Sequence, residues 1–392
     1  MQRESLTSAR GFSLMEMMIS LALSLIVVGA AVQVFSKGMD ATLLVQQRAE
    51  MQQDVRGAES MLVKDISMAG AGLPAGGLTL ISGTATAPHY GCDVTNGCKD
   101  INKTAINFPS QTSGAVTTNY LYAIIPGYAK GPTINVSQGA TDVITVAYVD
   151  PNVSWGNYKV AFATGTTTTA TVSGTDPVST VSPKLNDPGY GLKVGDLVWF
   201  SGSRSGSTVW GIGEVTLVSG TSSPYTVTLA TGDTMQLNQT GGSSGLAGLV
   251  SPSTACPTPA ANVISCTISR ILLITYSLDS VTDSAGNVTY RLIRQVNGQA
   301  PVPLVENVSD LRFRYDVYDS TRTPPTQVNT TDALMSSGGS PNLIRKVDIT
   351  HLTIRSPLAG QAGYQGMDIQ TSVAARNLAF SDRYPGPTIN AY

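Results

Sequence analysis

A single carboxylate, Glu16, stands in an otherwise apolar stretch near the start of the chain. Residues 12–35 form a run of 24 residues in which Glu16 is the only charged side chain. A carboxylate inside an apolar helix costs on the order of 2.5–3.5 kcal/mol on membrane-insertion scales. A group kept at that cost normally has a functional partner, so Glu16 is the first residue from which we expect chemistry.

Four cysteines offer a second kind of chemistry, the formation of disulfide bonds. They form two close pairs, Cys92 with Cys98 and Cys256 with Cys266. In an oxidising compartment each pair could close a short loop, with a stabilisation of about 2–3 kcal/mol per loop in the chain-entropy model. Four cysteines allow three connectivities, so pairing within each close pair is an expectation, and free thiols are the alternative.

The two histidines do not complete a zinc-binding group in the sequence. His351 lies in an alternating segment, residues 347–354, which is typical of a strand that carries it on one sheet face. His89 precedes Cys92 and Cys98, but this spacing lacks the four-ligand pattern of a zinc site. A disulfide explains the cysteines more simply, so we expect no metal here.

Three further oxygen-bearing residues, Asp279, Asp283 and Asn287, are candidates for calcium ligands. Their spacing departs from the EF-hand pattern, and aspartate and asparagine are common in turns. A turn is therefore the better interpretation. Because neither histidine lies near a serine-nucleophile motif, the sequence predicts no catalytic residue, no metal and no cofactor, and a chain that is not an enzyme.

The composition favours an exported, β-rich protein without a nucleic-acid partner. The chain has 392 residues, enough for one large domain or two ordinary ones. Charged residues make up 13% and the formal net charge is -2, whereas nucleic-acid binding requires a basic face. Beyond the apolar run the sequence is rich in glycine, serine, threonine and valine.

The apolar run is long enough to cross a membrane. As a helix, residues 12–35 would extend roughly 36 Å, against a hydrocarbon core of about 30 Å. Arg3 and Arg10 precede the run, and the positive-inside rule then puts the leader in the cytoplasm and the rest outside. The alternative is an ordinary signal peptide cut after Ala30, but the run is too long for one and Glu16 has no role in one.

The helical period continues beyond the apolar run. Apolar residues recur in steps of four and three at Met51, Val55, Ala58, Leu62, Ile66 and Ala69. The residues between them are mostly polar and include Lys64 and Asp65. We predict one helix over residues 13–68, apolar all round in its first half and amphipathic in its second. Gly70 and Pro74 end it, and its amphipathic half requires a sheet to pack on.

The remainder of the chain has the pattern of strands and turns. Before residue 265 the candidate strands are residues 119–125, 143–149, 158–163, 196–201, 210–219 and 225–229. After it they are residues 267–278, 288–296, 310–318, 346–355 and 368–375. Residues 283–287 form a turn that makes the first two of these a hairpin. Residues 192–200 and 211–217 are typical of successive strands of a small barrel or sheet.

The start of the chain resembles a known processing signal. Residues 11–16, GFSLME, are similar to the class III signal of type IV pilins and type II secretion pseudopilins. The resemblance implies that a prepilin peptidase cuts between Gly11 and Phe12 and that the new amine of Phe12 is N-methylated. It also implies that Glu16 stays in the helix and pairs with the amine of a neighbouring subunit, which acts on register and recruitment.

Later segments resemble one branch of this superfamily. Residues 294–298, 304–315 and 372–378, with the helix end at 65–70, look like PilW-type minor pilins and J-type minor pseudopilins. Residues 78–265 depart from the compact pilin plan. J-type pseudopilins usually lack so long an insertion, so PilW is the better match.

These features together define an expected fold and organisation. The fold class is α+β, with a long transmembrane-amphipathic helix packed on an antiparallel β-sheet pilin head that carries a large β-rich insertion. The expected segments are a leader (1–11), a membrane or filament-core helix (12–36), an amphipathic helix (37–70), the insertion (71–265) and a C-terminal antiparallel sheet (266–392).

The resemblance implies a minor pilin that primes type IV pilus assembly and sits at the filament tip. Its expected partners are prepilin peptidase, other minor and major pilins, the inner-membrane assembly platform and, before assembly, membrane lipid. Its expected location is the inner membrane and then the pilus at the cell surface. The alternatives are a minor pseudopilin of type II secretion and an adhesin or ligand-binding head delivered by the pilin helix.

Overall fold

A computed structural model of the chain divides into two compact units. One comprises Met1–Gln53 with Ser356–Gln365, and the other comprises Asp54–Arg355 with Gly366–Tyr392. The structure describes residues 12–74, 76–82, 86–94, 97–98, 106–113, 116–162, 168–177, 183–204, 207–239, 246, 249, 266–319, 326–331, 341–357 and 363–378. The boundary after residue 53 falls within the segment expected to be one amphipathic helix.

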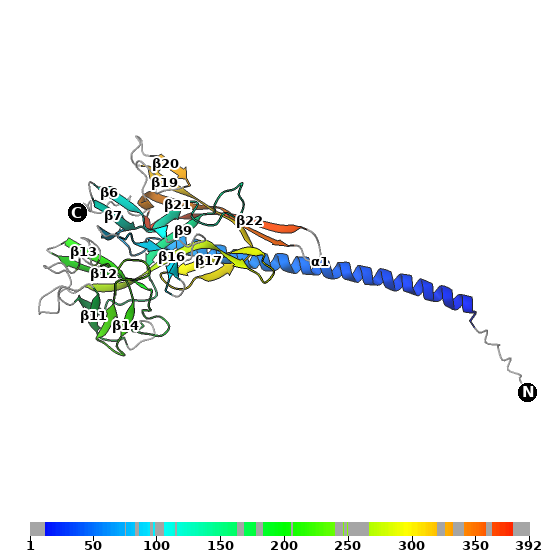
Figure 1. Cartoon of the computed structure of the whole chain (residues 1–392), viewed down its shortest axis with the longest axis horizontal. Coiled ribbons are helices and arrows are strands. Elements are labelled where there is room, and N and C mark those ends of the chain that lie inside the picture. The colour runs from blue at the N-terminus through cyan, green and yellow to red at the C-terminus, as the bar shows by residue number, and fades with distance from the viewer. Residues whose placement is uncertain are drawn as a thin grey trace, which may run out of the picture. The chain divides into compact units, whose positions relative to one another are not determined.

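The single long helix, α1, spans Leu14–Met68 and confirms the predicted helix over residues 13–68 (Figure 1). It ends where two glycines adopt the left-handed conformation, with φ of 80° at Gly70 and 74° at Gly72. A side chain at Gly72 would also collide with Val149, because a Cβ there would lie 2.9 Å from the Cβ of Val149. Glycine therefore both ends the helix and lets the chain approach a strand closely.

The largest sheet gathers strands from both halves of the β-rich region. Its strands are β8 (Ile124–Gly127), β9 (Val143–Val149), β12 (Leu197–Arg204), β13 (Ser207–Glu214), β16 (Thr267–Thr282), β17 (Val288–Val296) and β18 (Val302–Val305). The 16-residue strand β16 is central, because β9, β12 and β17 all pair with it. Figure 1 shows β16 and β17 side by side as the predicted hairpin.

A second set of strands closes a small barrel against this sheet. Its strands are β10 (Tyr158–Phe162), β11 (Thr169–Gly174), β14 (Leu217–Ser219) and β15 (Tyr225–Thr228). An isolated bridge between Val160 and Cys266 joins β10 to the start of β16, and β14 directly follows β13. Because β13, β12 and β16 are neighbours in the large sheet, the strands form a ring. The Val160–Cys266 bridge closes it on one side, and the chain link from β13 to β14 closes it on the other. Of the predicted strands at 192–200 and 211–217, residues 197–200 lie in β12 and residues 211–214 in β13, whereas residues 192–196 come before β12 and Leu217 begins β14.

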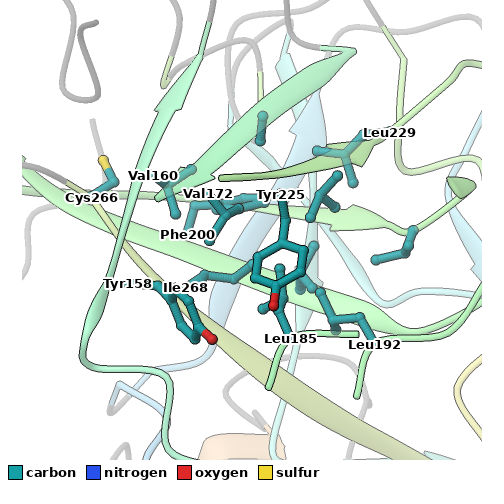
Figure 2. Packing of buried hydrophobic residues seen from close by; sticks show 14 of the residues in the cluster. Tyr158, Val160, Val172, Leu185, Leu192, Phe200, Tyr225, Leu229, Cys266 and Ile268 are labelled. Carbon is teal, nitrogen blue, oxygen red and sulfur yellow. The ribbon is translucent and has the colours of Figure 1, made fainter. Parts of the chain in front are cut away.

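The barrel is filled by aromatic and branched side chains. Figure 2 shows side chains from its strands converging on one buried cluster. Tyr158 and Tyr225 meet edge to face with ring centroids 6.0 Å apart, and Phe162 and Phe200 meet at 5.1 Å. Rings in these orientations stabilise a core beyond the area that they bury.

The remaining strands form smaller sheets. One contains β1 (Leu78–Ser82), β6 (Ser110–Ser113) and β7 (Val116–Leu121), and two pairs are β2 (His89–Tyr90) with β5 (Ile106–Asn107) and β3 (Cys92–Asp93) with β4 (Gly97–Cys98). The C-terminal sheet contains β19 (Val308–Asp319), β20 (Thr326–Thr330), β21 (Ile344–Pro357) and β22 (Tyr364–Ala374), with a short 3-10 helix, η1, at Pro341–Leu343. The predicted α+β class, one long helix with a large and largely antiparallel β part, is confirmed.

Two predicted strands are each divided in the structure, which corrects their bounds. Residues 119–125 become β7 and β8, and residues 210–219 become β13 and β14. In both cases the chain leaves one sheet and joins another. Tyr122 and Ala123 at the first break are buried, so the apolar pattern continues across the change of sheet and hides it from the sequence.

The expected boundary at residue 265 lies within a continuous sheet. β16 begins just after it and pairs with β9 and β12, which come before it. The division into an insertion and a C-terminal sheet therefore describes the order of segments along the chain, and the strands on either side of residue 265 belong to one sheet.

Candidate processing and assembly site

The first described residues form the start of α1. Phe12 lies outside the helix and is 87% exposed. The backbone N–H of Glu16 donates to Ser13 Oγ (3.1 Å), and the backbone N–H of Ser13 donates to Glu16 Oε2 (3.4 Å). This reciprocal pair is a capping box, which satisfies backbone donors that a helix start otherwise leaves free. Gly11, the expected residue before the cut, lies outside the described residues.

The first half of α1 exposes apolar side chains all round. Among the described residues, α1 is a helix long and apolar enough to span a bilayer, and its most apolar window is 0% buried. Large side chains such as Leu25 (72% exposed) and Phe35 (70%) face outward from this unit. A core helix of a soluble domain would bury such side chains, so this half requires lipid or other helices around it.

The last turns of α1 are buried on one face only. Val55, Ala58, Leu62 and Ile66 are each at most 2% exposed, which confirms the amphipathic stripe predicted for this half. The prediction was wrong for Asp65. It grouped this residue with the polar side chains between the apolar positions, but Asp65 is only 3% exposed. Asp65 follows Leu62 by three residues, and residues three apart lie on the same face of a helix. This spacing was the signal in the sequence that Asp65 would be buried.

Asp65 accepts three hydrogen bonds from the β-sheet of the same unit. Its Oδ1 takes one from Tyr148 on β9 (2.9 Å), and its Oδ2 takes bonds from Tyr276 on β16 (2.6 Å) and from Arg294 Nε on β17 (2.8 Å). Burial raises the pKa of both tyrosines well above the ordinary value, so both hydroxyls keep their protons and donate. A buried carboxylate with a cation and two further donors is well compensated. We call these four residues the Asp65 hub.

The structure describes three of the four cysteines. Cys92 and Cys266 are fully buried and disulfide-bonded. Cys98 stands directly opposite Cys92 in the pairing of β3 with β4, which suits the expected local pair. Cys256 lies outside the described residues. The connectivity therefore stays a prediction.

The remaining candidates form no metal centre in the part of the chain that the structure describes. His351 Nδ1 lies 3.0 Å from Asp368 Oδ2 on an exposed part of the C-terminal sheet. His89 Nδ1 lies 3.3 Å from the carbonyl oxygen of Ala87. Asp283 Oδ1 accepts bonds from the N–H groups of Ala285 and Asn287, so the loop is the expected turn.

Comparison with known proteins bears on the start of the chain. Residues 6–32 match the prokaryotic N-terminal methylation motif. This match indicates a type IV pilin or pseudopilin that prepilin peptidase processes, and it suggests a structural, non-enzymatic role. The exposed apolar half of α1 is consistent with membrane anchoring of such a protein.

No curated protein and no solved structure matches the chain. The motif match ends at residue 32, so it does not reach the later segments that resemble PilW. The specific branch of the superfamily stays a prediction.

Proposed function

We propose that the chain is a minor pilin that takes part in type IV pilus assembly after cleavage between Gly11 and Phe12. The observation that carries this proposal is the methylation motif over residues 6–32, continuous with a helix whose apolar side chains are exposed. Cleavage creates an amine on Phe12, which the peptidase then methylates. The helix anchors the chain in the inner membrane until it enters the filament.

Glu16 is the residue we assign to recruitment. Its Oε2 accepts the bond from the Ser13 N–H, and a carboxylate has two oxygens and several lone pairs, so it can accept further bonds. The capping box holds the carboxylate near the helix start, where the Phe12 amine of an adjacent subunit would meet it. Such a pair is strong only when dry and well aligned, so it acts on register more than on stability.

The size of the β-rich part supports a minor rather than a repeating subunit. Residues 71–265 add the barrel and much of the large sheet before the C-terminal strands begin. Subunits that repeat along a filament must fit their heads beside neighbours at every step, whereas a subunit at the tip meets fewer neighbours. The expected partners are other minor and major pilins and the inner-membrane assembly platform.

Substitution of one glycine tests the processing step. Gly11→Val should leave an uncleaved precursor, because a bulky side chain blocks the approach of the peptidase to the backbone. Gly29→Val is the matched control, since a Cβ at Gly29 meets nothing within 4 Å. Precursor and mature chain are separated by gel mobility in cells with and without the peptidase. Normal maturation of the Gly11 variant would overturn the proposal.

A further inference from the structure

Two of the three tryptophans lie at the surface of the barrel hairpin. Trp199 on β12 and Trp210 on β13 are each partly exposed at the margin of a buried cluster. Trp155, by contrast, is 3% exposed and packs beneath the Arg270 guanidinium. Trp199 and Trp210 therefore keep part of their rings exposed to solvent, whereas Trp155 does not.

Strand register gathers these tryptophans with a group of hydroxyls. Trp199 pairs with Ser269 on β16, and Ser201 pairs with both Trp210 and Thr267. Paired residues and alternate residues along a strand share one face, so all five lie on the same side of the sheet. The Ser201 and Thr267 hydroxyls are 2.9 Å apart and exposed.

The same face is deeply buried farther along the strands. Leu197 and Ile271 are 0% exposed, and Ile212, which pairs with Trp199 itself, is 2% exposed. Exposure then rises toward Trp199 and Thr267. The two tryptophans thus lie at the edge of the buried cluster, where this face of the sheet becomes exposed to solvent.

A neighbouring sheet adds a phenol and another hydroxyl. Trp210 Nε1 donates to Thr79 Oγ1 on β1 at 3.3 Å. Thr79 pairs with Tyr120 on β7, which is stacked on Tyr122 with ring centroids 5.6 Å apart. Tyr120 is partly exposed and packs against the same buried cluster as the two tryptophans.

We propose that Trp199, Trp210, Tyr120 and the hydroxyls around them form a binding surface for a neutral glycan. The apolar C–H faces of a sugar ring stack on flat aromatic rings, and its hydroxyls exchange hydrogen bonds with serine and threonine hydroxyls. The residues that make up the surface carry no formal charge, which matches an uncharged polymer. It lies in the barrel-bearing region and goes beyond the proposed role in assembly.

Trp199 provides a second observation in favour of a ligand. Its Nε1 is buried and has no hydrogen-bond partner among the residues that the structure describes. A buried donor without an acceptor costs about 1–3 kcal/mol. A hydroxyl-bearing ligand supplies acceptors for such a donor.

Tryptophan fluorescence of the full-length protein gives a direct test. The protein is held in lipid nanodiscs, because sugar-headed detergents would compete. Trp155→Phe removes the buried indole, so that the remaining emission reports Trp199 and Trp210. The probes are dextran, mannan, galactan and cello-oligosaccharides, with heparin and alginate as charged comparisons. We expect saturable quenching by at least one neutral probe.

Substitutions then assign the binding to this surface. Trp199→Ala and Trp210→Ala should each weaken retention on the bound polysaccharide about tenfold or more, as central aromatic contacts do. Tyr190→Ala, which removes an isolated aromatic that is 62% exposed, is the matched control and should bind normally. The proposal is overturned if no neutral probe binds, if binding survives both tryptophan substitutions, or if only the charged polymers bind.

Discussion

Glu16 and Asp65 are carboxylates of the same helix, but their surroundings differ in kind. Glu16 is exposed, and its described bonds are made within the first turn of α1. Asp65 is buried and takes its bonds from three strands. The Glu16 carboxylate can therefore still bind another molecule, whereas the Asp65 carboxylate is bonded to residues of its own unit.

The difference separates assembly from folding along one helix. The half of α1 around Glu16 exposes apolar side chains, so its surroundings must come from lipid or other subunits. The half around Asp65 packs its apolar stripe within its own unit. Mutations in the first half should therefore affect association, and mutations in the second half should affect stability. The predictions below test that division, from the largest expected change in unfolding free energy to the smallest.

Removal of the hub carboxylate should have the largest effect on stability. Asp65→Ala leaves the Arg294 guanidinium and two tyrosine hydroxyls without their acceptor, and breaking a buried ion pair costs about 3–5 kcal/mol. Thermal unfolding and protease resistance measure this loss. Asp54→Ala, at an exposed position of the same helix, should change stability by less than about 0.5 kcal/mol. Equal effects of the two substitutions would refute the role of the hub.

A third carboxylate, Glu214, makes the stability of the β-rich unit depend on pH. Burial, and then the charge of Asp233, raise the pKa of Glu214 from 4.5 to about 8. The folded state therefore holds a proton that the unfolded state loses as the pH rises above 4.5. This contribution is complete below pH 4.5 and is lost as the pH rises through about 8.

Denaturation curves across this range check the sign. We expect the free energy of unfolding of the natural protein to fall by a few kcal/mol at most between pH 4.5 and 8. Glu214→Gln should flatten the profile, whereas Glu306→Gln, at an exposed position, should leave it unchanged. A natural profile that rises over the same window would contradict the assignment.

Loss of one hub donor should have an intermediate effect. Tyr276→Phe keeps the ring in the core and removes the 2.6 Å bond to Asp65 Oδ2, at a cost of about 1–3 kcal/mol. In the Asp65→Ala background the same change should cost much less, because the acceptor is already absent. Purely additive effects in a double-mutant cycle would mean that Tyr276 acts through packing alone.

Glu16→Ala should have the smallest effect on the fold and a large effect on assembly. The protease resistance of the β-rich unit and cleavage after Gly11 should both be normal. Co-purification with other pilins and the number of surface filaments should fall, because the Phe12 amine loses its counter-charge. Normal partner binding together with normal filament number would show that Glu16 serves only to cap the helix.

Local patterns in the sequence predicted the elements better than their contacts. The helix and the strands at 143–149 and 288–296 matched the structure because their periodicity or apolar runs are uninterrupted. The divided strands failed because a change of sheet leaves no mark when both flanks stay apolar. Asp65 was missed because its partners, Tyr148 and Tyr276, are far from it in the sequence.

The candidate site shows the same contrast. Glu16 could be singled out because a charge in an apolar run is a local anomaly, and its role in recruitment stays a prediction. The aromatic surface was missed because it depends on the register that aligns Trp199, Trp210 and Thr267, which comes from pairings between distant segments.

The N-terminal peptide of the mature natural protein tests the central claim most directly. Mass spectrometry of protein purified from its own cells identifies the first residue and any modification of its amine. We predict that the mature chain begins at Phe12 and that this residue is N-methylated. A chain that retains residues 1–11, or one that begins at Ala31, would contradict the account.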